Sequence, residues 1–404
     1  MSTVTSPGHR PAPSRLIARN RRVLGDQRDQ DRSSTDSRGR RRPGRRSRAL
    51  RLSLAVAALA VLALLGAGLA VYGSPADDPL AGAPVITVEG DTVALSMVGD
   101  TLLGDAAQPL IDRLGASWVG TYVDPFPPGD VVLANLEGPI TDRTEAFDPT
   151  QQWPYNADPV VAQALADLGV DVVSLANNHA FDRGPEGLAD TMANAAAVDL
   201  FTIGAGSTSA EARLPLLVRS DSTTVAVTAF GDSGGAVTAA ADRPGLRRAS
   251  ADNFVADLEL AHVAGADRVV AFVHWGENYA DIDDRQRALA QSLVDAGYDL
   301  VIGHGSHTVQ PIEYIDGVPV VFSLGNWIFG TPGRFTGEFP GYGLVVRAVL
   351  DTNDVALEVQ CVVTDNELVI YQPRPCTQTQ ADRVVGGLHP SMRMVDGVGH
   401  LGAG

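Results

Sequence analysis

The sequence predicts an α/β fold, a layered α/β sandwich preceded by one transmembrane helix. Three observations lead to this prediction. Short apolar runs alternate with stretches whose apolar residues recur at helical spacing. Several of the apolar runs end abruptly in polar or ionisable residues. One further run, near the N-terminus, is long enough to cross a bilayer.

The net charge of −17 is spread very unevenly along the 404 residues. Residues 1–51 contain 15 Arg and 4 Asp, a balance of +11, whereas the rest of the chain contains 16 Arg and 44 acidic residues, a balance of −28. Residues 1–48 are rich in Arg, Ser, Pro and Gly and predict a disordered cytoplasmic tail. The Arg run at 38–48 is compatible with nucleic-acid binding, but it fits a topology-setting membrane flank better. We therefore expect no nucleic-acid partner.

Residues 54–72 form an unbroken run of 19 apolar or small residues. At ~1.5 Å per residue a helix of this length spans ~28 Å, close to the thickness of a bilayer core. A signal peptide has a shorter apolar core of ~7–15 residues, although small residues such as Ala67 and Ala70 keep cleavage open as an alternative. We predict a single-pass anchor over residues 49–72, with the N-terminus cytoplasmic and the remaining chain extracytoplasmic in the cell membrane.

After a linker over residues 73–84, strand and helix patterns alternate, which predicts a largely parallel sheet within a domain over residues 85–376. The expected helices cover residues 157–168, 185–197, 251–264 and 283–296. Beyond residue 341 the pattern predicts antiparallel strands in a second sheet packed on the first, at residues 344–350, 356–363 and 368–371. Residues 377–404 are weakly patterned and predict a poorly ordered tail.

The chain has two cysteines, Cys361 and Cys376. Because disulfides persist outside the cytoplasm, we expect these two to form a bridge. The alternative is a pair of unpaired, buried thiols.

The chain is organised around residues 172–184, where an apolar run ends in two amides, an imidazole and, slightly later, a carboxylate. In open α/β sheets, ligands bind at the carboxyl ends of strands. Five other apolar runs end in the same way. Taken together, the six runs are followed by Asp100, by Asn135 and Glu137, by Asn177, Asn178 and His179, by His274, by His304 and His307, and by Asn326.

Amide, imidazole and carboxylate groups are the ligands that borderline and hard divalent cations accept. A single His after a strand, or a Gly-Asn pair, is by itself more typical of a structural contact or a turn. The joint pattern, however, predicts a site for one or two divalent ions (Mn, Fe, Zn or Mg), with His179 placed to donate a proton or a hydrogen bond. The predicted metal ligands are Asp100, Glu137, Asn178, His274, His304 and His307.

These motifs together resemble the CapA/PgsA family of capsule and poly-γ-glutamate biosynthesis proteins, over about residues 90–350. The matching motifs are Gly99-Asp100, Asn135-Leu136-Glu137-Gly138-Pro139, Ala176-Asn177-Asn178-His179 with Asp182 and Gly184, His274-Trp275-Gly276-Glu277, Gly303-His304 with His307 and Gln310, and Ser323-Leu324-Gly325-Asn326. The resemblance implies a metallophosphatase-like fold. It also implies a membrane-anchored, outward-facing role in making or exporting an anionic polymer.

A more distant similarity to calcineurin-type metallophosphoesterases implies Asn178, His274, His304 and His307 as ligands. It also implies His179 as the acid-like catalytic group. We predict Asp182, three residues later, as a second catalytic residue. The sequence departs from that pattern in three places. Leu102 stands where a second His is expected, Asn135 and Glu137 replace an aspartate motif, and the last His pair has two residues between its members. Whether the site is catalytic is therefore open.

Three functions follow as hypotheses. The first is a CapA-type protein acting through a divalent-metal site in synthesis or export of an anionic envelope polymer. The second is a metal-dependent phosphoesterase on an envelope substrate. The third is a non-catalytic, polymer-binding assembly factor. The expected partners are the membrane, the polymer or its precursor, and other subunits of a polymer synthase.

Overall fold

The computed structural model describes residues 78–232 and 237–402. The predicted cytoplasmic tail, the membrane anchor and the first part of the linker lie outside these residues. No helix in the described part of the chain is long and apolar enough to cross a bilayer. From Gly82 onward the described chain forms one compact unit, and its first strand begins at Val85.

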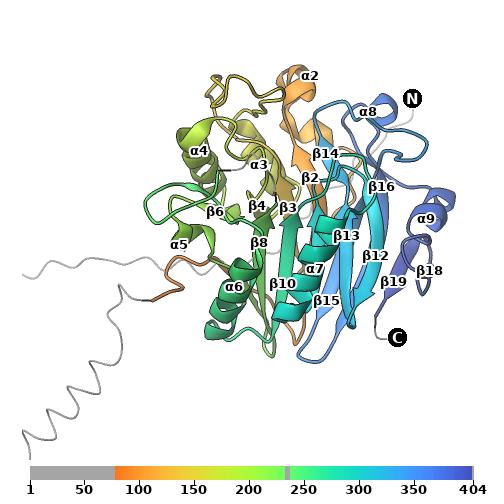
Figure 1. The fold of residues 1–404 in the computed structure, drawn as a ribbon. Coiled ribbons are helices and arrows are strands. Elements are labelled where there is room, and N and C mark those ends of the chain that lie inside the picture. The colour runs from red at the N-terminus through yellow and green to blue at the C-terminus, as the bar shows by residue number, and fades with distance from the viewer. Residues whose placement is uncertain (1–77, 233–236, 403–404) are drawn as a thin grey trace, which may run out of the picture. The chain divides into compact units, whose positions relative to one another are not determined.

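Two mixed β-sheets pack face to face in this unit (Figure 1). The seven-stranded sheet has the order β1 (Val85–Thr87), β7 (Leu216–Arg219), β8 (Thr224–Gly231), β10 (Arg268–His274), β11 (Leu300–His304), β13 (Val318–Leu324) and β12 (Val309–Ile315). The ten-stranded sheet has the order β18 (Arg393–Val395), β19 (Val398–Leu401), β16 (Val355–Val363), β15 (Tyr342–Leu350), β2 (Val93–Leu102), β3 (Val131–Leu136), β4 (Val172–Ser174) and β5 (Phe201–Ile203). Its two remaining strands are β14 (Asn326–Phe329), which pairs with β2, and β17 (Arg374–Pro375), which pairs with β16.

Helices cover the outer faces of both sheets. Apolar residues of α2 (Gln108–Leu114), α3 (Val160–Asp167) and α4 (Gly184–Ala197) pack with the outer face of the ten-stranded sheet. Those of α6 (Ala251–Val263) and α7 (Asp284–Ala296) pack on the seven-stranded sheet. The shorter elements are η1 (Asp105–Ala107), η2 (Ala116–Gly120), α5 (Ser209–Ala212), β6 (Ala205–Gly206), β9 (Gly245–Leu246), α8 (Asn366–Val369) and α9 (Gln378–Val384).

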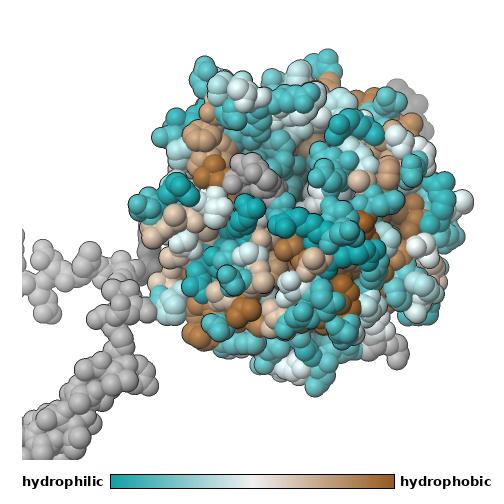
Figure 2. All heavy atoms as spheres, viewed as in Figure 1, coloured by the Kyte–Doolittle hydropathy of each residue, from teal (hydrophilic) through white to brown (hydrophobic). Residues whose placement is uncertain are grey.

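The long apolar runs exist because central strands are buried on both faces. In β10, Val270 and Phe272 point between the sheets, whereas Val269, Ala271 and Val273 pack under α6 and α7. Such strands show continuous apolar runs rather than alternation. The outer face of α6 and α7 is largely hydrophilic, with apolar side chains scattered rather than gathered into one large patch (Figure 2).

The structure confirms the layered α/β class, the helices α3, α4, α6 and α7, and the strands β15 and β16. The prediction of one largely parallel sheet carrying all six polar strand ends is wrong. Strands β2, β3 and β4 lie in one sheet and β10, β11 and β13 in the other, and the antiparallel pair β15–β16 extends the first. When a strand is apolar on both faces, its sequence does not indicate which of the two sheets it joins.

Two predictions for the C-terminal region are also wrong. Residues 368–371 are not a strand, because Asp365 caps the short helix α8 and Ile370 and Tyr371 adopt left-handed backbone angles. Residues 377–402 are not a loose tail. Thr377 and Gln380 form a capping box that starts α9, and Val385, Leu388 and Leu401 are buried in the core between the sheets.

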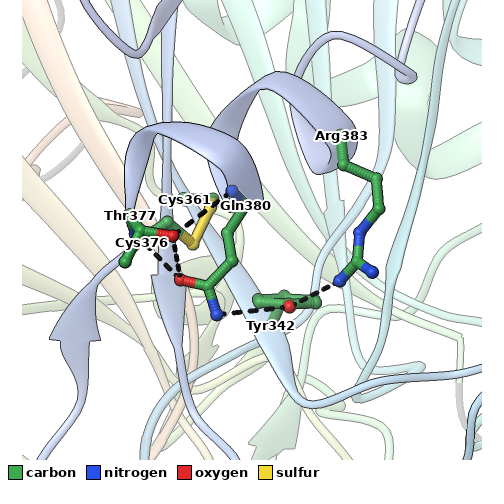
Figure 3. The surroundings of a disulfide bond; sticks show 6 residues. All are labelled: Tyr342, Cys361, Cys376, Thr377, Gln380 and Arg383. Carbon is green, nitrogen blue, oxygen red and sulfur yellow. Dashed lines mark hydrogen bonds between the residues drawn. A yellow bond between two sulfur atoms is a disulfide. The ribbon is translucent and has the colours of Figure 1, made fainter.

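Cys361 and Cys376 form the predicted disulfide, which ties β16 to the segment that begins α9 (Figure 3). The bridge closes a loop with a sequence separation of 15 residues. The chain-entropy model assigns such a loop ~3 kcal/mol of stabilisation.

We expect the double substitution Cys361→Ser and Cys376→Ser to lower the thermal midpoint of unfolding by about 5–10 °C, because the unfolded chain regains the entropy of the loop. Calorimetry of the variant and of the wild type with and without reductant measures this. Reduced wild type should match the variant. An unchanged midpoint in both samples would contradict a stabilising bridge.

Candidate metal centre

Asp100 lies where the two sheets meet and has no exposed surface. It is paired in register with Asn135 of β3 on one side and Asn326 of β14 on the other, next to a bulge in β2. Its backbone N–H donates to the carbonyl of Gly325 at 3.0 Å. A side chain at Gly99 could not be accommodated, since its Cβ would lie 1.8 Å from that same carbonyl oxygen. The chain passes from β13 in one sheet to β14 in the other at this point.

His274 and His304 reach Asp100 from the seven-stranded sheet. They are the last residues of the parallel neighbours β10 and β11 and are opposite one another in register. Their Nδ1 atoms are 3.3 Å apart and lie 3.9 and 3.4 Å, respectively, from Oδ1 of Asp100. The His304 ring packs on Phe272, with ring centroids 4.4 Å apart.

This arrangement fits a divalent cation. Ligand atoms around a tetrahedral ion with ~2.0–2.1 Å bonds lie ~3.3–3.4 Å from one another, close to the separations seen here. Two imidazoles and a carboxylate suit Zn, Mn or Fe. The side-chain oxygen of Asn178 is buried without a hydrogen-bond partner in the described chain, so it has an unused lone pair to offer a cation.

A second group of ionisable side chains shares Asp100 and adds Glu137 and His307. Here the two nitrogens of one ring face different carboxylates. His307 Nδ1 lies 3.1 Å from Oδ2 of Asp100, and Nε2 lies 3.4 Å from Oε1 of Glu137. Nδ1 also contacts the side-chain oxygen of Asn326 at 2.9 Å. The ring therefore lies between the two carboxylates. Because its two nitrogens face different groups, these residues surround an ion less completely than Asp100, His274 and His304 do.

The pKa values of these groups reflect their burial. Burial lowers the pKa of His274 well below its usual range and also lowers that of His304, so both are held neutral, the form that binds metals. Burial alone would raise the pKa of Asp100, but the hydrogen bonds from His304 and His307 hold it well below its usual range. Burial opposes charge on His307 as well, yet the carboxylates of Glu137 and Asp100 raise its pKa to about 9.

Two amides hold the ligands in place. Asn135 Nδ2 lies 2.9 Å from Asp100 Oδ1, 3.3 Å from Glu137 Oε2 and 3.4 Å from His274 Nδ1. Asn177 donates to the side-chain oxygen of Asn135 at 3.0 Å and accepts from the backbone N–H groups of His179 and Ala180. Asn177 thereby links the loop after β4 to the centre of the site.

His179 and Asp182 form a hydrogen-bonded pair beside this centre. His179 Nδ1 lies 2.8 Å from Asp182 Oδ2, and Asp182 also accepts from the Tyr155 backbone and the Gln151 side chain, both at 2.7 Å. His179 is near enough that a positive charge on it disfavours protonation of His274. It retains 9% of its surface exposed, so a ligand can reach it.

Four aromatic side chains, which we call the aromatic collar, lie beside the two outer imidazoles, His179 and His307. Tyr155, Tyr279 and Phe329 pack against these rings, and Phe335 packs edge-on against Tyr279. Tyr155 stacks on His179 at 4.2 Å, whereas Tyr279 and Phe329 lie 5.7 and 4.9 Å from His307 between ring centroids. Tyr279 has a φ of 55° and donates its backbone N–H to Ser306 at 2.7 Å. Left-handed φ is rare for a bulky residue and concentrates at functional sites.

The structure thus brings together five of the six predicted ligands, Asp100, Glu137, His274, His304 and His307, and pairs His179 with Asp182. Asn178 is partly buried next to His179, and its side-chain oxygen has no hydrogen-bond partner among the described residues. The sequence had marked Asn135 and Asn326 as strand ends without a role, and it gave no sign of the collar.

A family model described as "Bacterial capsule synthesis protein PGA_cap" matches residues 94–331. Among curated proteins, "PGA biosynthesis protein CapA" of Bacillus subtilis is 33% identical over 249 residues, covering 61% of this chain and 65% of that protein. "Capsule biosynthesis protein CapA" of Bacillus anthracis is 31% identical over 257 residues, covering 61% and 62%. A "Probable polyglutamine synthesis accessory protein" of Mycobacterium tuberculosis is 36% identical over 210 residues, covering 49% and 55%. The chain spans less than two thirds of the length of these relatives.

Two solved structures are similar to parts of the chain. A 5'-nucleotidase precursor from Thermus thermophilus aligns with a TM-score of 0.42 and 15% identity, covering 68% of this chain and 55% of that one. The NAD nucleotidase of Haemophilus influenzae aligns with a TM-score of 0.38 and 11% identity, covering 75% and 57%.

We expect the purified protein to retain about one divalent ion per chain, and Asp100→Asn and His304→Ala to lose it, because each removes a ligand atom at the better-formed position. Elemental analysis after dialysis against trace Mn²⁺ and Zn²⁺ measures the content. His262→Ala, on the distant helix α6, is the control and should keep the ion. Thermal midpoints verify that each variant is folded. A wild type without bound ion, or full retention by the folded Asp100→Asn protein, would refute the site.

Proposed function

Because the chain belongs to the bacterial capsule synthesis protein PGA_cap family, we propose that it acts in the synthesis or export of an anionic envelope polymer of the poly-γ-glutamate type, through a divalent-metal site. The observation that carries this proposal is the position of the candidate ligands. Asp100, His274 and His304 all lie within the family-matched residues 94–331 and converge at the junction of the two sheets.

A divalent ion held by these residues would act as a Lewis acid on a carbonyl or phosphoryl oxygen of the substrate. The protein residues supply the rest of the chemistry. Asp182 accepts from Nδ1 of His179 and fixes the orientation of the ring, which leaves Nε2 as the nitrogen that can hold or give a proton. The aromatic collar limits access of water to the two outer imidazoles and presents ring faces to a substrate at the mouth of the site.

A second candidate function, a metal-dependent phosphoesterase acting on an envelope substrate, is favoured by this His179–Asp182 pair. A carboxylate-oriented imidazole beside a metal centre is the arrangement expected of a general acid for a leaving group. This second proposal includes a metallophosphatase-like fold and the binding of one or two ions.

We further propose that the domain lies outside the cytoplasm, tethered by the apolar run at residues 54–72. That run has the length of a bilayer span, and the Arg-rich segment before it favours a cytoplasmic N-terminus. The disulfide adds support, because such bridges persist in oxidising compartments. Partnership with other polymer-synthase subunits belongs to the same proposal.

We expect deletion of the gene to reduce the envelope polymer, and a plasmid copy with His304→Ala to fail to restore it, since that protein lacks a ligand. Polymer content of washed cells and immunoblots of the variant measure this. The His262→Ala copy should restore production. Unchanged polymer in the deletion strain would count against the polymer role, and full rescue by a stable His304→Ala protein would count against the metal site.

If the phosphoesterase candidate is correct, the Mn²⁺-loaded protein hydrolyses an aryl phosphate, and His179→Ala lowers kcat about 10²–10⁴-fold, the usual contribution of a general acid. Metal content should stay at the wild-type level, because His179 is not one of the expected ligands. His262→Ala, on helix α6, serves as the control. Absence of turnover with Mn²⁺, Zn²⁺ and Fe²⁺ would eliminate this candidate.

A further inference from the structure

A pocket with a volume of about 240 Å³ lies between the start of β12, the loop before β15 and the C-terminal helix α9. One wall begins at Thr308, the residue directly after His307, and continues along β12 through Gln310. The opposite wall contains Tyr342, at the start of β15, and Arg383 of α9. A group bound in this pocket therefore lies next to the loop that carries a residue of the metal centre.

Tyr342 and Arg383 together present hydrogen-bond donors to the pocket. Arg383 Nη2 donates to the Tyr342 hydroxyl at 2.7 Å, and the guanidinium lies 5.7 Å from the centre of the Tyr342 ring. The hydroxyl accepts a second, longer contact of 3.5 Å from Gln380. Because the hydroxyl oxygen only accepts in these contacts, its own proton has no acceptor in the described chain. Tyr342 as a residue is only 8% exposed and lines the pocket, so a group bound there can accept this proton.

Arg383 is an exposed residue and forms no salt bridge with any carboxylate of residues 78–232 and 237–402, so most of its N–H groups are open to water or to a ligand. A guanidinium with free N–H groups next to a phenolic O–H matches the lone pairs of a carboxylate. Glu338, an exposed residue of the loop before β15, also lines the pocket, and solvent screens the charges of both Glu338 and Arg383.

The disulfide holds this donor pair in place (Figure 3). Cys376 is bonded to Cys361 of β16, and the next residue, Thr377, caps α9 together with Gln380. Gln380 and Arg383 project from α9 toward the same Tyr342 hydroxyl. The bridge, the capping box and the two contacts to Tyr342 thus form a continuous support for the Arg383 guanidinium.

We infer that this pocket is a carboxylate-binding subsite, in which Arg383 and Tyr342 hold an acidic side group of the polymer while an adjoining part of the chain reaches the metal centre. The inference rests on the proposed function and adds the recognition of the substrate's acidic groups. It assigns specificity to residues outside the family-matched segment 94–331. The domain as a whole is acidic, so an anionic chain needs such a local cation to approach it.

Calorimetric titration of the full chain in detergent, with a synthetic γ-linked glutamate hexamer as the ligand, tests the inference. A γ-linked isoglutamine hexamer, in which an α-carboxamide replaces each free α-carboxylate, is the neutral comparison. The variants are Arg383→Gln and Tyr342→Phe, with Arg393→Gln as the matched control, since Arg393 is an exposed arginine of β18 outside the pocket. Metal content and the thermal midpoint of each variant are measured in the same samples.

The glutamate hexamer should bind the wild type at least about tenfold more tightly than the isoglutamine hexamer. Arg383→Gln should weaken glutamate binding about 10–100-fold and Tyr342→Phe severalfold, with metal content unchanged and Arg393→Gln within about twofold of wild type. Equal binding of the two hexamers, no binding of either, or wild-type affinity in folded Arg383→Gln would overturn the inference. The polymer content of the deletion strain tests the proposed function separately.

Discussion

The whole arrangement depends on the burial of one carboxylate, that of Asp100, at the junction of two sheets. A fully buried carboxylate is strongly unfavourable unless charged or hydrogen-bonding groups surround it. Here the backbone N–H of Gly305 and the amide of Asn135 donate to it, and His304 and His307 lie on either side. These partners come from both sheets. Asp100 can therefore be buried at low free-energy cost only where the two sheets meet in the way seen here. A divalent cation would balance the same charge.

The sheet architecture explains why residues far apart in sequence share one site. Parallel register between β10 and β11 sets His274 beside His304, and the crossing from β13 to β14 at Gly325 places Asn326 beside Asp100. The C-terminal segment then extends the site outward. The Cys361–Cys376 bridge ties the start of α9 to β16, and α9 forms one wall of the pocket whose other residues include the start of β12.

The sequence was most informative where chemistry follows directly from a strand. Asp100, His274 and His304 could be selected because each interrupts an apolar run, and the structure joins them. It was least informative about which sheet each strand enters, since strands buried on both faces look alike. The tail after residue 377 was misjudged because its core contacts, such as Val385, are single apolar residues without periodicity. The supporting amides and the collar depend on tertiary contacts that no local pattern records.

The most direct measurement of the central claim is anomalous diffraction from crystals grown with Mn²⁺ or Zn²⁺, collected on both sides of the metal absorption edge. We expect a peak within ~2.0–2.2 Å of the Asp100 carboxylate and of the His274 and His304 imidazoles. Crystals of the loaded protein with no anomalous peak near these side chains, or with the ion bound only at surface carboxylates, would contradict it.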